Sequence, residues 1–382
     1  MATEFVPDQL PVQESPQSSG AAGKLRVWPR ILWALVCFAG LEGILFHTSL
    51  YSSIIEPDST TGSLEIQLRN EIKRPKPNRN QVLAVGHSRM ALLPRIANQM
   101  QPPTGYTFGT IGLGGTAARD WYYSLRAVDP TAHQYAAIVI PCDDYNEPDS
   151  YDYQSEREAD LHYLIARLGW RDLFDFPWTY NTPRLRWLAI RGLLLKGYVY
   201  KRDFEEFLDH PRERIAKVRY YDRDSFGWYY GFGGTDESLA GMEIDWQHKV
   251  IHFPDRVTAA QRESIHSELF PDPGPQDGSQ TAYLRYWYGR IVDYYRGSGT
   301  KIFFLRVPRA PSSPPDPPAR QASAVRQLAG KPGVIVLDEH LFDPIERPEL
   351  FWDGLHLNHD GMDRFSEILA TAVRQALGPP RS

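Results

Sequence analysis

The fold is decided by residues 81–90, which read QVLAVGHSRM. The first six of these form a short apolar run ending at a glycine, a pattern that predicts a buried strand followed by a tight turn. Similar apolar runs recur at residues 107–111, 135–140, 301–307 and 334–337. Helical patterns separate these runs, so we predict an α/β fold. Because each run is apolar throughout, we expect a parallel sheet with helices on both faces, a three-layer α/β/α sandwich.

The expected helices fall between these strands and after the last of them. They are predicted at residues 90–100, 116–128, 281–296, 319–329 and 360–377. The section 149–279 contains several helical pieces and no clear strand alternation, so we expect a helical insertion over the strand ends. Residues 81–382 then form one large domain that carries this insertion, which their length permits.

A single apolar run of about 20 residues, 31–50, is long enough to cross the hydrocarbon of a bilayer. We predict a transmembrane signal anchor there, preceded by a disordered tail over residues 1–30 and followed by a charged linker over residues 51–80. Glu42 and His47 lie within the run, and they leave open an alternative in which it is an amphipathic helix of the domain.

Charges flanking the run predict its orientation. Lys24, Arg26 and Arg30 precede it, whereas Glu56 and Asp58 follow it. By the positive-inside rule we expect a cytoplasmic N-terminus. The domain would then lie outside a bacterial inner membrane, in the periplasm or outside the cell.

Composition excludes some functions. The net charge of −5 and the pI near 6.1 provide no broad basic face, so we expect no nucleic-acid partner. The chain has two cysteines, Cys37 and Cys142, too few for a cysteine-based zinc site. We expect no cofactor.

Polar residues follow several predicted strands, where ligand sites of open α/β sheets lie. Ser88 follows the first strand, and a glycine cluster ending at Gly115 follows the second. Asp144 and Asn146 follow the third. Near the C-terminus, Asp353-Gly354-Leu355-His356 places a carboxylate and an imidazole on one short loop.

The order of these pieces resembles the SGNH/GDSL hydrolase family, from residue 81 to residue 377 apart from the insertion. The resemblance implies Ser88 as nucleophile, Asp353 and His356 as its relay partners, and Gly115 as an oxyanion donor beside the N–H of Ser88. The chain departs from the family at Gly-His-Ser, where Gly-Asp-Ser is usual. It also lacks the Gly-x-Asn-Asp block, so Asp143, Asp144 or Asn146 must stand in; we assign Asn146 to the oxyanion hole.

The chemistry explains these residue types. A serine hydroxyl becomes a useful nucleophile when a base removes its proton, so His356 must reach Ser88. Asp353 would fix the imidazole tautomer and stabilise its protonated form. We also expect Arg89 and Asp144 to contact substrate. A metal cluster of Asp353, His356 and His359 is the alternative, although it lacks an evident fourth ligand and we predict no metal.

The anchor and the segment EPDSTTG at residues 56–62 resemble those of membrane-anchored members of the SGNH/GDSL family, which act in alginate O-acetylation and teichoic acid D-alanylation. The resemblance implies that Ser88 accepts an acyl group, acetyl by expectation, from a multi-span membrane acyltransferase and passes it to a polysaccharide hydroxyl. Two alternatives remain: an esterase that deacylates glycans, and a catalytically silent scaffold of a polysaccharide-modifying complex.

Overall fold

The computed structural model describes residues 20–100, 105–146, 156–223, 235–271, 279–316 and 323–380. Its centre is a five-stranded sheet in the order β2-β1-β3-β6-β7. The strands are β1 (Gln81–Gly86), β2 (Thr107–Gly112), β3 (Ala137–Cys142), β6 (Lys301–Arg306) and β7 (Val334–Val336). Every pairing in this sheet is parallel, which confirms the predicted α/β class and parallel sheet.

Alternate residues of the strands enter two separate cores. In β1, Leu83 and Val85 join one core, while Val82 and Ala84 join the other. The first core includes side chains from α3 (Thr60–Lys73), α5 (Ala118–Val128), α12 (Ser279–Tyr294) and α13 (Ala324–Leu328). The second includes side chains from α4 (Pro94–Gln99) and α14 (His359–Leu377). Because both sets of strand residues are buried, the strands are apolar throughout.

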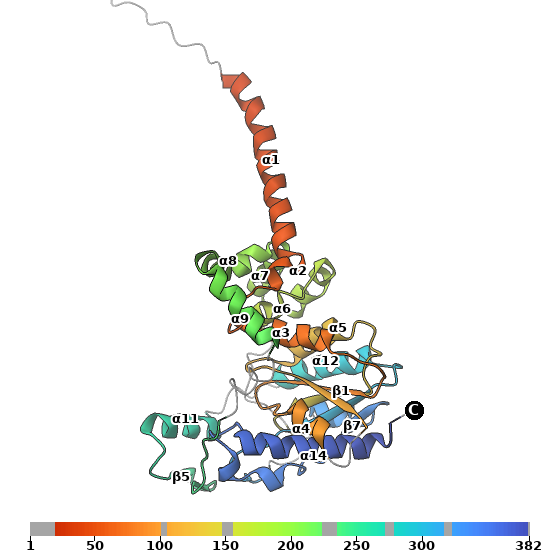
Figure 1. The fold of residues 1–382 in the computed structure, drawn as a ribbon, viewed down its shortest axis with the longest axis vertical. Helices are drawn as coiled ribbons and strands as arrows, with labels where there is room; N and C mark the ends of the chain where they lie inside the picture. The colour runs from red at the N-terminus through yellow and green to blue at the C-terminus, as the bar shows by residue number, and fades with distance from the viewer. Residues whose placement is uncertain are drawn as a thin grey trace, which may run out of the picture.

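A long N-terminal helix, α1 (Gly20–Phe46), projects away from the domain (Figure 1). The stretch Trp28–Ser52, which includes the short helix α2 (Ser49–Ser52), is long and apolar enough to span a membrane. Its side chains from Trp28 to Leu41 are exposed, so α1 is not a core helix of the domain. Residues 1–19 of the predicted tail lie outside the described residues, and the helix begins at Gly20, earlier than predicted.

The two ionisable residues of the apolar run lie at the base of α1, where they contact the domain. Glu42 is buried and accepts a hydrogen bond of 2.9 Å from the N–H of Gly197, in the first turn of α8 (Lys196–Asp209). The His47 ring stacks on Trp170, with 4.7 Å between ring centroids. Both ionisable side chains therefore have partners within the protein.

The segment predicted as a linker, residues 51–80, contains the buried helix α3 (Thr60–Lys73). Ser59 begins it by accepting a hydrogen bond from the N–H of Gly62 at 3.0 Å. The helix buries polar side chains: Glu65 pairs with Arg167 at 2.7 Å, and Gln67 bonds both backbone groups of Gly112. Such paired polar residues hide the apolar periodicity by which a core helix is recognised.

The insertion is not wholly helical, which corrects the prediction. Its described parts contain α6 (Ala159–Leu164), α7 (Pro183–Leu194), α8, α9 (Pro211–Arg223) and α11 (Ala259–Leu269), together with the antiparallel hairpin β4 (Glu243–Asp245) and β5 (Val250–His252). The half with α6 and α7 joins the first core, and the half with the hairpin and α11 joins the second. The insertion thus contributes to both cores.

Candidate functional site

Two segments that lie far apart in the sequence, the turn of Ser88 and the loop of Asp353 and His356, meet at the carboxyl end of β1. The Oγ atom of Ser88 lies 2.8 Å from Nε2 of His356. The Nδ1 atom of His356 lies 2.8 Å from a carboxylate oxygen of Asp353. Because an ionised carboxylate can only accept, Nδ1 carries the proton and Nε2 is left to accept from the serine hydroxyl.

The loop that carries Asp353 and His356 is held by its own backbone. One carboxylate oxygen of Asp353 accepts from the N–H groups of Leu355 and His356, at 2.8 and 2.6 Å, which leaves the other oxygen for the imidazole. The indole of Trp352 stacks on the His356 ring at 5.8 Å. These contacts fix the plane of the imidazole before any substrate arrives.

Glu268 of α11 supports the same loop, and the sequence analysis missed it. Its carboxylate accepts from the N–H of Gly354 at 2.9 Å, and from the Ser264 hydroxyl at 2.9 Å. Burial and the nearby charge of Asp353 raise the pKa of Glu268. An isolated glutamate on a helix of the insertion carries no pattern that could have signalled this contact.

The turn that presents Ser88 differs from the expected strand-to-helix turn. The predicted helix over residues 90–100 begins only at Pro94 and is the short α4. Ser88 is exposed and lies well before the N-terminus of that helix, so the turn does not lead directly into a helix. Proline at the first helical position suits the start of the helix, and it disfavours helical backbone at the preceding Leu93, which is extended.

The glycine cluster after β2 lies beside Ser88. A methyl group built on Gly114 would lie 3.6 Å from Cβ of Ser88. Gly115 has φ of +76°, a conformation that favours glycine, and a Cβ there would meet Oη of Tyr163 at 2.7 Å. The carbonyl of Gly86 ties this turn to β1 by accepting from Leu113 N–H at 3.1 Å.

Two side chains of the insertion hold the carbonyls of this turn. Tyr163 Oη donates to the Gly114 carbonyl at 2.7 Å, and Arg157 donates to the Gly115 carbonyl. A trans peptide holds its C=O and N–H on opposite sides, so the N–H of Gly115 points away from Tyr163. Among the described residues, the N–H groups of Ser88 and Gly115 have no hydrogen-bond acceptor. Both are free to bind a ligand oxygen.

Arg157 is itself fixed by a buried acid. Its guanidinium lies 3.3 Å from Asp160, which also pairs with Arg119 of α5 at 2.9 Å, both side chains being fully buried. Burial raises the pKa of Asp160, against the lowering effect of the two arginine charges. This pairing joins the insertion to the helix that follows the glycine turn.

Asp144 and Asn146 contact each other, and Asn146 also contacts α13. The Asp144 carboxylate accepts from the N–H of Asn146 at 2.8 Å, and burial raises its pKa. The side-chain oxygen of Asn146 accepts from Arg326, in α13, at 3.0 Å. These contacts do not direct Asn146 toward Ser88, and its oxyanion role stays a prediction, as does substrate binding by Asp144.

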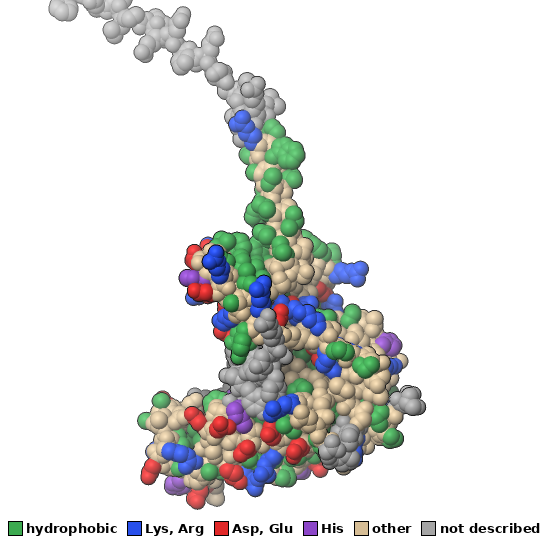
Figure 2. All heavy atoms as spheres, viewed as in Figure 1, with side chains coloured by type: hydrophobic (Ala, Val, Ile, Leu, Met, Phe, Trp, Pro, Cys, Tyr) green, Lys and Arg blue, Asp and Glu red, His purple; other side chains and the backbone are tan. Residues whose placement is uncertain are grey.

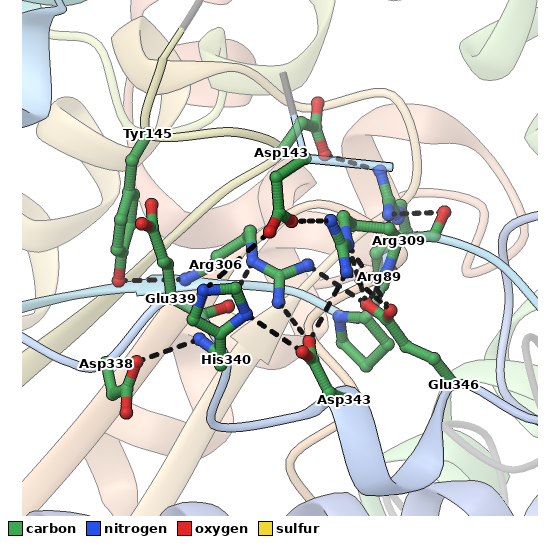
Figure 3. A network of polar contacts seen from close by, with 12 residues as sticks. Arg89, Asp143, Tyr145, Arg306, Arg309, Asp338, Glu339, His340, Asp343 and Glu346 are labelled. Carbon is green, nitrogen blue, oxygen red and sulfur yellow. Dashed lines mark hydrogen bonds and ion pairs between the residues drawn. The ribbon is translucent and has the colours of Figure 1, made fainter. Parts of the chain in front are cut away.

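Arg89, predicted to contact substrate, is bound within the protein. It pairs with Asp143 at 2.7 Å and also donates to the carbonyl of Pro308 (Figure 3). His87 lies 3.4 Å from the same Asp143 carboxylate. Burial would raise the pKa of Asp143, but the charges of Arg89 and His87 outweigh it and hold the pKa well below its usual range. Arg89 thus clamps the Ser88 turn to the residues that follow β3 and β6.

A second group of charged residues fixes the segment after β6, whose Pro308 carbonyl accepts from Arg89. Arg306 and Arg309 converge on the buried Glu346, at 3.0 and 3.1 Å (Figure 3). Arg309 also donates its backbone N–H to Glu346 at 2.8 Å. The segment that accepts from Arg89 is therefore fixed in turn. The sequence analysis missed this network, whose members are separated by about 40 residues.

The metal alternative finds no support in the side-chain arrangement. His359 bonds Asp236 at 2.8 Å rather than joining Asp353 and His356. In the described part of the chain, no group of three or more histidine, cysteine, aspartate or glutamate side chains is arranged to hold a metal ion.

Comparison with known proteins adds no family assignment: no family model matches the chain, and no curated protein matches it.

Replacing Arg89 by methionine should lower stability in a pH-dependent way. The pKa of Asp143 is depressed in the folded state, so its contribution is present above the unfolded pKa of about 3.9 and is lost as pH falls through the folded pKa. We expect Arg89→Met to cost about 1–3 kcal/mol at pH 7, with the difference shrinking below about pH 4. Thermal unfolding of the purified full chain measures this.

The matched control is Arg184→Met, which removes an arginine paired at 3.1 Å with Glu158 on an exposed surface. Exposed pairs contribute little, so this variant should unfold almost as the parent does. Equal losses in the two variants, or a loss for Arg89→Met that does not change with pH, would contradict the clamp.

Proposed function

We propose that the chain is a membrane-anchored acyl-transfer enzyme of the SGNH/GDSL type, with a three-layer α/β/α domain and an acyl group carried on Ser88. The observation that supports this most directly is the relay of hydrogen bonds from Ser88 through His356 to Asp353, with both distances at 2.8 Å. A hydroxyl, an imidazole and a carboxylate in this order are the parts that nucleophilic acyl transfer requires.

The proposed reaction has two balanced halves. In the first, Nε2 of His356 takes the hydroxyl proton as Oγ of Ser88 attacks the acyl carbonyl carbon, forming a tetrahedral oxyanion. The oxyanion collapses, the bond to the leaving group breaks, and His356 returns the proton to that group. In the second half, an acceptor hydroxyl loses its proton to His356, attacks the acyl-serine and restores the Ser88 hydroxyl.

The N–H groups of Ser88 and Gly115 are the proposed oxyanion donors. Neither has an acceptor among the described residues, and Tyr163 directs the Gly115 N–H away from the insertion. Donors fixed before the reaction stabilise the charge that develops, by about 3–4 kcal/mol for one donor in a known serine enzyme. Asn146 stays a proposed third donor through its side-chain N–H2 group, since Arg326 engages only its side-chain oxygen.

The anchor supports the choice of transfer over plain hydrolysis. We propose that α1 spans a bacterial inner membrane with Lys24, Arg26 and Arg30 on the cytoplasmic side, which leaves the domain outside. Activated acyl donors would then have to be supplied across the bilayer, so a multi-span membrane acyltransferase is the proposed donor. A polysaccharide hydroxyl is the proposed acceptor, and acetyl the proposed group.

One observation favours the esterase alternative. Ser88 is exposed to solvent, so water could attack an acyl-serine as readily as a sugar hydroxyl. The two functions differ in how the acyl-enzyme responds to an acceptor. A transferase turns over faster when an oligosaccharide is added and forms an acylated sugar, whereas an esterase releases free acid at the same rate with or without it.

Replacing Ser88 by alanine should abolish the reaction. We expect Ser88→Ala to lower hydrolysis of an aryl acetate, and transfer to an oligosaccharide, by about 10³-fold or more, because the nucleophile is lost. Release of the phenol and the mass of the sugar product measure the two activities. Ser267→Ala, which removes a hydroxyl bonded only within α11, is the control and should keep full activity. Undiminished acylation of the sugar by the Ser88→Ala variant would contradict the proposal.

Tyr163→Phe tests the positioning of the Gly115 N–H. The variant loses the hydrogen bond to the Gly114 carbonyl, so the peptide can rotate and stabilise the oxyanion less well. We expect kcat to fall about 2- to 10-fold with KM unchanged, because the donor acts mainly in the transition state. Tyr220→Phe, at an exposed ring, is the control. A change in KM alone would show that Tyr163 serves substrate binding instead.

A further inference from the structure

Four large aromatic side chains are exposed on three adjoining elements, one of which contacts the residue just after α1. They come from the short 3-10 helices η2 (Trp170–Phe174) and η3 (Phe176–Thr179) and from α7. They are between 57% and 83% exposed, and we call them the aromatic shoulder: Trp170, Phe174, Trp178 and Trp187. Figure 2 shows hydrophobic side chains gathered around the foot of α1. Exposed apolar groups this large and this close mark an interaction surface.

The shoulder is continuous with the base of α1. The Trp170 ring stacks on His47, one residue beyond the end of α1, with 10° between the ring planes. Glu42, a turn earlier, bonds the first turn of α8. The exposed Leu194 and Leu195 lie at the junction of α7 and α8. The shoulder therefore adjoins the end of α1 at Trp170.

The length of α1 sets the level of the shoulder. From Trp28 to Phe46 the helix rises about 28 Å, at about 1.5 Å per residue. The hydrocarbon core of a bilayer is about 30 Å thick. If α1 spans it from Trp28, the headgroup region begins near Phe46, close to where the helix meets the domain. The shoulder then lies at that level.

The chemistry of the shoulder suits lipid headgroups. Tryptophan is enriched at membrane interfaces, where its ring is apolar and its N–H is polar. Arg186 lies over the Trp178 ring, 5.8 Å from its centroid, and Arg171 is exposed beside Trp170. Guanidinium groups bind phosphate oxygens with paired hydrogen bonds, while their stems cover apolar surface. This combination matches phospholipid better than a purely apolar partner.

We propose that the aromatic shoulder rests in the headgroup layer of the membrane that α1 spans, and contacts phospholipid directly. The inference rests on the anchor in the proposed function, and it adds that the domain is held against the bilayer rather than swinging on a single helix. The rim that carries Ser88 is thereby kept at a fixed height above the lipid surface.

The test uses the full chain with Cys37 replaced by alanine, which leaves only the buried Cys142. A single cysteine is introduced by Phe174→Cys, and in separate proteins by Leu35→Cys in α1 and by Glu263→Cys in α11, which lies far from α1 (Figure 1). Each is labelled with an environment-sensitive fluorophore and reconstituted into vesicles of phosphatidylcholine and phosphatidylglycerol. Lipids with a spin label near the top or near the end of the acyl chain serve as shallow and deep quenchers.

The inference predicts a blue-shifted, quenched emission for Phe174→Cys and for Leu35→Cys, and neither effect for Glu263→Cys. Quenching at Leu35→Cys with none at Phe174→Cys would overturn the shoulder contact while leaving the anchor standing. No quenching at Leu35→Cys would overturn the anchor itself. A label at position 174 that is exposed in pure lipid but shielded in native membranes would show that a protein covers the shoulder, which also contradicts the inference.

Discussion

The hydrogen bond between Ser88 and His356 is the contact on which the rest of the account depends, since it joins the first strand of the sheet to the loop before the last helix. The fold brings these parts together at a second point. Ser366 of α14 accepts from the N–H of Leu93 at 2.8 Å, so the segment after the serine and the helix after the histidine are fixed to each other. Central β1, flanked by β2 and β3, gives the serine turn a rigid base.

The strands of the sheet could be predicted because both of their faces are buried, which leaves a continuous apolar run in the sequence. The elements that were missed lack such a signal. The helix α3 buries Glu65 and Gln67 in specific pairs, so its sequence reads as a charged linker. The short hairpin β4 and β5 has three residues in each strand, too few for an alternating pattern to be recognised.

The candidate site divides in the same way. Ser88, Asp353 and His356 could be chosen from short sequence words, and the structure brings them together. Their supports could not, because each depends on a contact between distant segments: Tyr163 and Arg157 on the glycine turn, and Glu268 on the histidine loop. Arg89 was assigned to substrate because the sequence cannot show that Asp143 and the Pro308 carbonyl already bind it.

The insertion therefore does more than cover the strand ends. One half holds the glycine turn, and the other half holds the loop of Asp353 and His356.

The central claim, that Ser88 is a nucleophile activated by His356, is tested most directly by trapping Ser88. An organophosphonate added to the purified full chain should give one adduct, which peptide mass spectrometry locates on Ser88 and which His356→Ala abolishes. An adduct on another residue, no adduct, or equal labelling of the His356→Ala variant would contradict it.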